Sequence, residues 1–370
     1  MEKQRRIAQE LLDKAEIQIN GTNPWDIQIF NSKFYRRVFS QGSLGLGESY
    51  MDGWWDCEKL DEFFCKALRS NLEKEIKKKN ILIEILKSRI FNPQSLSKAF
   101  QIGETHYDIG NDLYEAMLDS RMTYTCGYWK DAKNLEEAQE AKLELVCKKI
   151  GLKEGNRVLD IGCGWGSFAE YTAENYGVSV LGITVSKEQV KLARERCKGL
   201  DIKIELQDYR EINEKFDHIV SLGMFEHVGI KNYRKYFEIA RKNLEENGLF
   251  LLHTIGGNKS VISSDKWLSK YIFPNSMLPS IAQISKSFEG LFVMEDWHNF
   301  GADYDKTLME WHKNFNNNWD KLKDKYDDRF KRMWDYYLLS CAGSFRARKN
   351  QLWQIVLSPK GVKGGYSRIV

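Results

Sequence analysis

The stretch from Val158 to Gly166, with the sequence Val-Leu-Asp-Ile-Gly-Cys-Gly-Trp-Gly, constrains the fold more than any other part of the chain. The apolar run Arg157 to Ile161 predicts a short buried strand, which is followed by three glycines at alternate positions. The segment Ser167–Tyr176 then has the apolar spacing of an amphipathic helix. A strand, a glycine-rich turn and a helix form the first unit of a doubly wound α/β sheet, in which ligands bind at the carboxyl ends of the strands.

The glycine spacing G-x-G-x-G resembles the loop that binds S-adenosylmethionine (SAM) in class I methyltransferases. It differs from the G-x-G-x-x-G spacing of dinucleotide sites. Asp160 lies at the end of the predicted strand, where its carboxylate can bind a ligand ammonium or hydroxyl group. The resemblance therefore implies a cofactor loop that includes Asp160, Gly162, Cys163 and Gly164. The alternative interpretation is an ordinary tight turn in an α/β protein.

Beyond this loop the sequence alternates between predicted strands and predicted helices. Strands are predicted at residues 178–185, 202–206, 216–222 and 249–253, and helices at 187–197 and 232–244. This alternation indicates a mostly parallel sheet that is covered on both faces. We expect functional side chains to gather at the carboxyl ends of these strands.

Polar side chains follow the second and third strands of this sheet. The second strand has no acidic residue after it, although many class I methyltransferases place one there for the ribose hydroxyls. Neutral donors and acceptors can substitute for it, and the third strand is followed by groups suited to an adenine amino group and ring. The predicted cofactor contacts are Thr184, Ser186 and Gln189 after the second strand, and Gln207, Asp208 and Tyr209 after the third.

Glu226 and His227 follow the fourth strand, and His253 ends the fifth. A carboxylate and an imidazole at adjacent strand ends, just beyond the cofactor loop, can hold a small polar group or ion where chemistry occurs. A single Glu or His is usually structural, but their shared location favours a catalytic site.

The cysteine content and the distribution of apolar and charged residues indicate where in the cell the protein works. The seven cysteines contain no C-x-x-C pair, which predicts free thiols in a reducing cytoplasm and no metal site. The first ten residues are charged and do not read as a secretory signal, and no apolar run approaches the roughly 20 residues that span a bilayer. No nucleic-acid-binding motif accompanies the basic residues. We therefore expect a cytoplasmic protein that does not bind nucleic acid.

The 370 residues are enough for two domains. We predict a small N-terminal α/β domain at residues 1–85, a linker at 86–100 and a catalytic domain at 101–370. Within the first domain, the glycine-rich stretch 42–56 is expected to form turns. The segment Lys66–Lys98 has nine basic residues against three acidic ones, interleaved with apolar residues. It fits an anionic lipid surface, and it fits a solvated helix face equally well.

Two aromatic-rich segments are candidates for enclosing a substrate. Residues 102–129 mix aromatic and polar side chains, which favours a loop that closes over a ligand as a lid, or alternatively an aromatic packing collar. Residues 267–301 form an apolar stretch that can cap a long apolar substrate. Between them, Asn134 and Glu137 have the spacing of a helix N-terminus and predict a helix up to residue 150.

Longer motifs along nearly the whole chain resemble those of cyclopropane-fatty-acyl-phospholipid synthases. They are Ser43–Trp55, His106–Asp112, Val158–Gly166, Gly223–Gly229, Leu251–Gly256, Tyr271–Pro274, Glu295–Asp305 and Cys341–Arg348. The likeness includes the small first domain of the bacterial phospholipid enzymes, which the related mycolic-acid enzymes lack.

This resemblance implies methyl transfer from SAM to a cis double bond of a phospholipid acyl chain, after which the carbocation loses a proton and closes a cyclopropane ring. It implies bicarbonate as the base and a homodimer attached peripherally to the inner face of the cytoplasmic membrane. Tyr124 and Thr125 match cofactor contacts of the family. The positions that match its bicarbonate-binding groups are Cys126, Glu226, His253, Ile255 and Tyr304.

Cys341 matches a cysteine that is often described as the active-site nucleophile of the family. A thiol would trap the carbocation, so we expect Cys341 to be structural. The main alternative function is another lipid C- or N-methyltransferase. Gly223 to Glu226 replaces the Asn/Asp-Pro-Pro-Tyr motif of DNA amino-methyltransferases. A non-catalytic membrane-surface protein and a NAD dehydrogenase fit the sequence less well.

Overall fold

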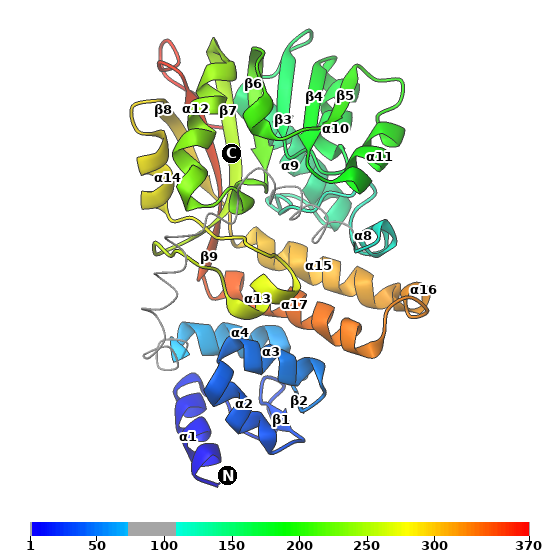
Figure 1. Cartoon of the computed structure of the whole chain (residues 1–370), viewed down its shortest axis with the longest axis vertical. Coiled ribbons are helices and arrows are strands. Elements are labelled where there is room, and N and C mark those ends of the chain that lie inside the picture. The colour runs from blue at the N-terminus through cyan, green and yellow to red at the C-terminus, as the bar shows by residue number, and fades with distance from the viewer. Residues whose placement is uncertain (1, 73–108, 370) are drawn as a thin grey trace. The chain divides into compact units, whose positions relative to one another are not determined.

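The computed structural model describes residues 2–72 and 109–369, and the chain divides into two compact units (Figure 1). The first unit comprises residues 1–91, 263–274 and 304–350, and the second comprises 92–262, 275–303 and 351–370. This division differs from the one predicted from the sequence, because two later segments group with the N-terminal part of the chain. The predicted linker at 86–100 lies outside the described residues.

The second unit is built on a seven-stranded sheet with the order β5-β4-β3-β6-β7-β9-β8 (Figure 1). Its parallel strands are β3 (Arg157–Ile161), β4 (Ser179–Thr184), β5 (Ile202–Leu206), β6 (Phe216–Leu222) and β7 (Leu244–Gly257). β8 (Val293–Asn299) and β9 (Asn350–Ser358) pair antiparallel at one edge. The predicted mostly parallel α/β sheet is therefore confirmed.

Helices bury both faces of this sheet. Val158 packs in a core with residues of α9 (Leu135–Ile150) and α10 (Ser167–Tyr176). Its neighbour Leu159 packs in another core with residues of α12 (Tyr233–Asn243) and α14 (Ile281–Phe288). Successive residues of a strand point to opposite faces, so a strand covered on both faces has to be apolar throughout, as the run before the glycines is.

Short sequence patterns predicted most of the helices of this unit at the positions where the structure has them. The Asn134 side chain accepts a hydrogen bond from the Glu137 backbone N–H and caps α9, as predicted. α11 (Lys187–Arg196) also lies where the sequence placed it. The predicted lid differs, because α8 (Asn111–Met117) occupies part of it and residues 102–108 lie outside the described part of the chain.

Two segments of the second unit differ from the sequence-based prediction. The fifth strand was predicted to begin at residue 249, but β7 begins at Leu244. Its pairing with β6 shifts register between Phe216 and His218. Residues 267–301 do not form one apolar insert, because they contribute α13 (Lys266–Tyr271) to the first unit, and α14 and β8 to the second.

The first unit is mainly helical. Its elements are α1 (Glu2–Leu12), α2 (Lys33–Gln41), α3 (Ser43–Met51), α4 (Leu60–Arg69), α13, α15 (Asp303–Asn317), α16 (Trp319–Leu322) and α17 (Asp328–Arg346), together with the two-residue strands β1 (Gln28–Ile29) and β2 (Trp55–Asp56). Among the described residues, no helix is long and apolar enough to cross a membrane.

The predicted turns at 42–56 are wrong in part, because Gly45 and Gly47 lie inside helix α3. A Cβ atom on Gly47 would lie 2.4 Å from Cδ1 of the Trp267 ring, and one on Gly45 would lie 2.5 Å from the Arg37 carbonyl oxygen. These glycines therefore allow close packing of the helix. The close packing compensates for the roughly 1 kcal/mol by which a glycine destabilises a helix interior.

Candidate cofactor and catalytic site

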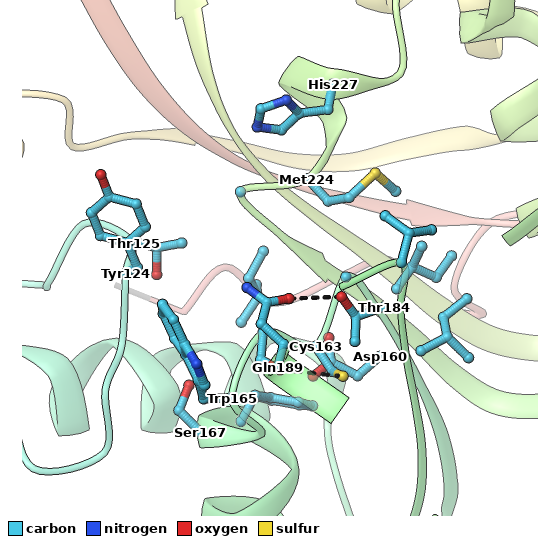
Figure 2. Close-up of a pocket in the computed structure, with 18 of the residues that line it drawn as sticks. Tyr124, Thr125, Asp160, Cys163, Trp165, Ser167, Thr184, Gln189, Met224 and His227 are labelled. Carbon is cyan, nitrogen blue, oxygen red and sulfur yellow. Dashed lines mark hydrogen bonds between the residues drawn. The ribbon is translucent and has the colours of Figure 1, made fainter. Parts of the chain in front are cut away.

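A pocket lies at the carboxyl ends of β3, β4, β5 and β6, where the sheet predicts ligand binding (Figure 2). The glycine loop after β3 forms one wall. Gly162, Gly164 and Gly166 have φ values of 84°, 56° and 85°, a conformation that favours glycine. A Cβ on Gly162 would lie 2.6 Å from the Met224 Cβ, so the absence of a side chain at this position lets the loop pass against the segment after β6.

Nearly all of the predicted cofactor residues line this pocket. They are Tyr124, Thr125, Asp160, Gly162, Cys163, Gly164, Thr184, Gln189, Gln207, Asp208 and Tyr209. Ser186 is not among the lining residues. Its side chain instead accepts a hydrogen bond from the Gln189 backbone N–H and caps helix α11. Their roles as cofactor contacts remain predictions.

Asp160 is buried at the end of β3, and its Oδ1 atom has no hydrogen-bond partner. Burial raises the pKa of this carboxyl to about 7, and the nearby Lys142 opposes the shift. An unpartnered carboxylate oxygen in a pocket wall is suited to a cationic donor such as an ammonium group, whose charge would favour the ionised carboxylate.

Polar groups at the ends of the neighbouring strands β4 and β5 are held by their own neighbours. Thr184 and Gln189 share a hydrogen bond of 2.7 Å between Oγ1 and Oε1 (Figure 2). Both oxygens of Asp208 accept hydrogen bonds of 2.7 Å from the Arg210 guanidinium, from Nε and from a terminal nitrogen. These contacts fix the side chains before any ligand arrives, which reduces the entropy lost on binding.

Several lining residues were not predicted, among them Lys142, Trp165 and Met224. Trp165 lies within the glycine loop, so its position in the sequence could have indicated it. Its ring centroid lies 4.8 Å from that of Tyr114, which also packs against Tyr124 at 5.2 Å. Aromatic residues of the predicted lid therefore pack against the pocket wall, and whether the segment acts as a lid or as a packing collar stays a prediction.

Glu226 is not among the lining residues, but it lies in the chain between two of them, Met224 and His227. Its Oε1 accepts a hydrogen bond of 2.6 Å from the Ile255 backbone N–H, whereas Oε2 is buried without a partner. Burial raises the pKa of the Glu226 carboxyl to about 7. This group can therefore donate or accept a proton near neutral pH.

His253 is buried on β7, opposite Leu222 at the end of β6. Its Nδ1 lies 3.3 Å from Nε2 of Gln354 on β9, and its own Nε2 has no partner. Burial, reinforced by Lys142 and Lys149, lowers the pKa of His253 well below its usual range, so the imidazole is neutral. The structure thus brings Glu226, Ile255 and His253 together at neighbouring strand ends.

The other predicted catalytic residues are distributed over both units. Cys126 is fully buried in the second unit, where it directly follows the pocket residues Tyr124 and Thr125. Tyr304 and Cys341 belong to the first unit, on α15 and α17. Their predicted roles therefore remain predictions. Among the described residues, no cluster of three or more His, Cys, Asp or Glu side chains is placed to hold a metal ion.

Comparison with known proteins shows similarity over most of the chain. Residues 94–355 match the family model described as mycolic acid cyclopropane synthetase. The chain is 58% identical over 361 residues to the cyclopropane-fatty-acyl-phospholipid synthase of Escherichia coli strain K12, covering 97% of this chain and 94% of that protein.

Solved structures agree with this similarity. The cyclopropane synthase MmaA2 from Mycobacterium tuberculosis superimposes with a TM-score of 0.66 at 30% identity, covering 70% of this chain and 97% of that one. The mycolic acid cyclopropane synthase CmaA1, complexed with SAH and CTAB, gives a TM-score of 0.65 at 30% identity with the same coverage. The motifs that suggested this resemblance from the sequence are thus supported by independent comparison.

Proposed function

The chain belongs to the mycolic acid cyclopropane synthetase family, and from this membership we propose that it adds a methylene group from SAM across the cis double bond of an unsaturated phospholipid acyl chain. The protein is a SAM-dependent class I methyltransferase. The 58% identity to a phospholipid-acting relative over almost the full length of both proteins supports the phospholipid substrate.

The pocket at the ends of β3 to β6 fits SAM. The sulfonium group of SAM supplies an electrophilic methyl carbon, which an alkene can attack without prior activation by a base. The residues of the chain therefore have to bind and orient the two reactants. Asp160 offers its unpartnered oxygen to the methionyl ammonium, and the glycine loop lets the backbone approach the ligand. Gln189 and Thr184 present neutral groups to the ribose, and Tyr209 lines the wall proposed for the adenine.

The side chains of Glu226 and His253 fit a small oxyanion such as bicarbonate, which would act as the base for the released proton. Two buried polar atoms without partners, Glu226 Oε2 and His253 Nε2, carry this part of the proposal. Burying such atoms is costly unless a ligand satisfies them. Neutral His253 can donate one hydrogen bond through Nε2, and a protonated Glu226 can donate another.

Carbocation chemistry also requires a site that excludes water and nucleophiles. His253 is fully buried, and the Phe300 ring lies edge-on to it at a centroid distance of 5.9 Å. Tyr128 in turn packs against Phe300 at 5.3 Å. Aromatic faces stabilise a nearby cation without forming a bond to it.

Cys341→Ser is expected to keep activity within about threefold of the parent enzyme, because a thiol that stays protonated is a poor nucleophile. Desolvation, reinforced by the charge of Asp265, raises the pKa of the Cys341 thiol to about 12, so almost no thiolate exists at neutral pH. The measurement is the initial rate of methylene transfer, with the melting temperature as a check on folding. Complete loss of activity in a normally folded variant would restore the covalent role.

We further propose that the enzyme works as a homodimer on the inner face of the cytoplasmic membrane. The basic composition of residues 66–98 supports attachment to anionic lipid. Equal binding to vesicles with and without anionic lipid would contradict the electrostatic part of this proposal. Light scattering in solution would give the oligomeric state.

The reaction itself is tested by mass spectrometry of phospholipid vesicles after incubation with the protein and SAM carrying a labelled methyl group. The expected product is a monounsaturated chain that has gained one CH₂ and lost its double bond. Label in the headgroup would instead indicate an N-methyltransferase. A gain of one CH₂ with the double bond retained would indicate a C-methyltransferase of another type.

A further inference from the structure

Three polar side chains of helix α9 are completely buried: Lys149 near the end of the helix and, two turns earlier, the pair Gln139 and Lys142. The members of this pair are three residues apart, so they lie on the same face of the helix. An amphipathic helix normally exposes its lysines, and burial of an ammonium group is unfavourable unless the protein gives it polar partners. Neither side chain of the pair belongs to the cofactor contacts predicted from the sequence.

Both side chains bind the segment that follows α8. The Gln139 Nε2 donates to the Thr125 carbonyl oxygen at 2.8 Å, and it also lies 3.4 Å from the Thr123 carbonyl oxygen. The Lys142 Nζ donates to the Thr125 Oγ1 at 3.0 Å. Asp119 accepts hydrogen bonds from the Thr123 N–H at 2.7 Å and from its hydroxyl at 3.1 Å.

Thr125 is confined on its other side as well. A Cβ on Gly223, at the end of β6, would lie 2.7 Å from the Thr125 Cγ2 methyl. The threonine thus has its carbonyl held by Gln139, its hydroxyl by Lys142 and its methyl against a residue that has no side chain. One contact holds the backbone of Thr125 and two restrict its side chain.

The held segment connects the two parts of the candidate site. Tyr124 and Thr125 line the pocket, on a segment facing the glycine loop and Met224 (Figure 2). Cys126 follows directly and is one of the residues predicted to bind the anion. An error in the position of Thr125 would therefore displace a cofactor contact and a candidate catalytic residue together.

We propose that Lys142 is a positioning residue, whose hydrogen bond to Thr125 fixes the segment Tyr124–Cys126 relative to the methyl donor. This inference rests on the proposed function, because it takes the pocket to be the SAM site. Lys142 also lines the pocket, and the carboxylates of Asp119 and Asp160 favour its charged form. Desolvation lowers the pKa of Lys142 to about 8, so the ammonium form still predominates at neutral pH.

The test is a double-mutant cycle with Lys142→Met and Thr125→Val. Calorimetry gives the Kd of SAM without lipid, and initial rates give kcat and KM. Each single variant is expected to weaken SAM binding by about tenfold to a hundredfold, the loss associated with one hydrogen bond to a charged donor. The double variant is expected to be no weaker than the weaker single variant, because both changes remove the same contact.

Lys148→Met is the matched control, since Lys148 lies on the same helix with 58% of its side chain exposed. It is expected to bind SAM like the parent protein. Losses that multiply in the double variant would overturn the proposal, and so would a Lys142→Met variant with unchanged SAM affinity and kcat.

If Lys142→Met does not fold, the SAM affinity of Thr125→Val tests the proposal by itself. Valine retains the shape of threonine and removes only the hydroxyl. Unchanged SAM affinity in Thr125→Val would then refute the proposal. A parent protein that binds SAM, shows the coupling and modifies no lipid would contradict the proposed function and leave the positioning role standing.

Discussion

Replacing Glu226 with glutamine is expected to lower the turnover of methylene transfer by about a hundredfold or more, with the Kd of SAM changed by less than about threefold. Glutamine has the same shape, and its oxygen can still accept the hydrogen bond from the Ile255 N–H. The unpartnered Oε2, however, becomes an amide nitrogen, which can still donate a hydrogen bond to the anion but can neither take up nor release a proton. Initial rates with labelled SAM and vesicles, together with calorimetry, measure the two quantities.

Glu195→Gln on the exposed surface of α11 is the control for the loss of one negative charge, and it should behave like the parent enzyme. His253→Ala is expected to have the same pattern as Glu226→Gln, because His253 contributes the second unpartnered atom. Loss of SAM binding in either variant would show that these residues support the cofactor pocket and not the chemistry.

The second large effect is expected for Gly162→Ala, which should weaken SAM binding by about a hundredfold or more. The φ of 84° at this position is unfavourable for alanine by roughly 1–2 kcal/mol. The added methyl would also lie 2.6 Å from the Met224 Cβ, so the loop or the segment after β6 has to move. Both line the pocket, and calorimetric titration with SAM measures the consequence.

Gly199→Ala separates backbone strain from obstruction. Gly199 has a similar φ of 88°, but nothing lies within 4 Å of a Cβ atom built on it, and it is not among the pocket residues. This control is expected to lower the melting temperature and leave the Kd of SAM unchanged. If Gly162→Ala also left the Kd unchanged, the glycine loop would not be the part of the pocket that approaches the cofactor.

Part of the site was accessible from the sequence because the signals are local. The strand before Gly162, the helix cap at Asn134 and the residues that follow β4 and β5 depend on a few consecutive residues. Parallel strands bring their carboxyl ends to one edge, so a correct strand order in the chain was enough to place the pocket. Ser186 shows the limit of this reasoning, since its hydroxyl serves a helix end and not the pocket.

Other features could not be inferred because they depend on contacts between distant segments. A glycine in a sequence indicates a turn, but Gly47 lies in a helix because Trp267, 220 positions later, needs the space of its side chain. The start of β7 also differs from the prediction, since Leu244 already pairs with Phe216 of β6, whereas Asn247 and Gly248 lie in the register irregularity before Leu249 pairs with His218. At Gly47, tertiary packing outweighs a local preference of about 1 kcal/mol.

The sequence by itself determined the α/β sheet, the cofactor loop and the family, because periodicity, glycine spacing and motif identity are properties of neighbouring residues. Only the tertiary structure showed that Lys142 is buried against Thr125 and that Glu226 and His253 each retain an unpartnered atom. The physical reason is that desolvation and hydrogen-bond satisfaction depend on all the atoms surrounding a group, and most of these come from remote parts of the chain.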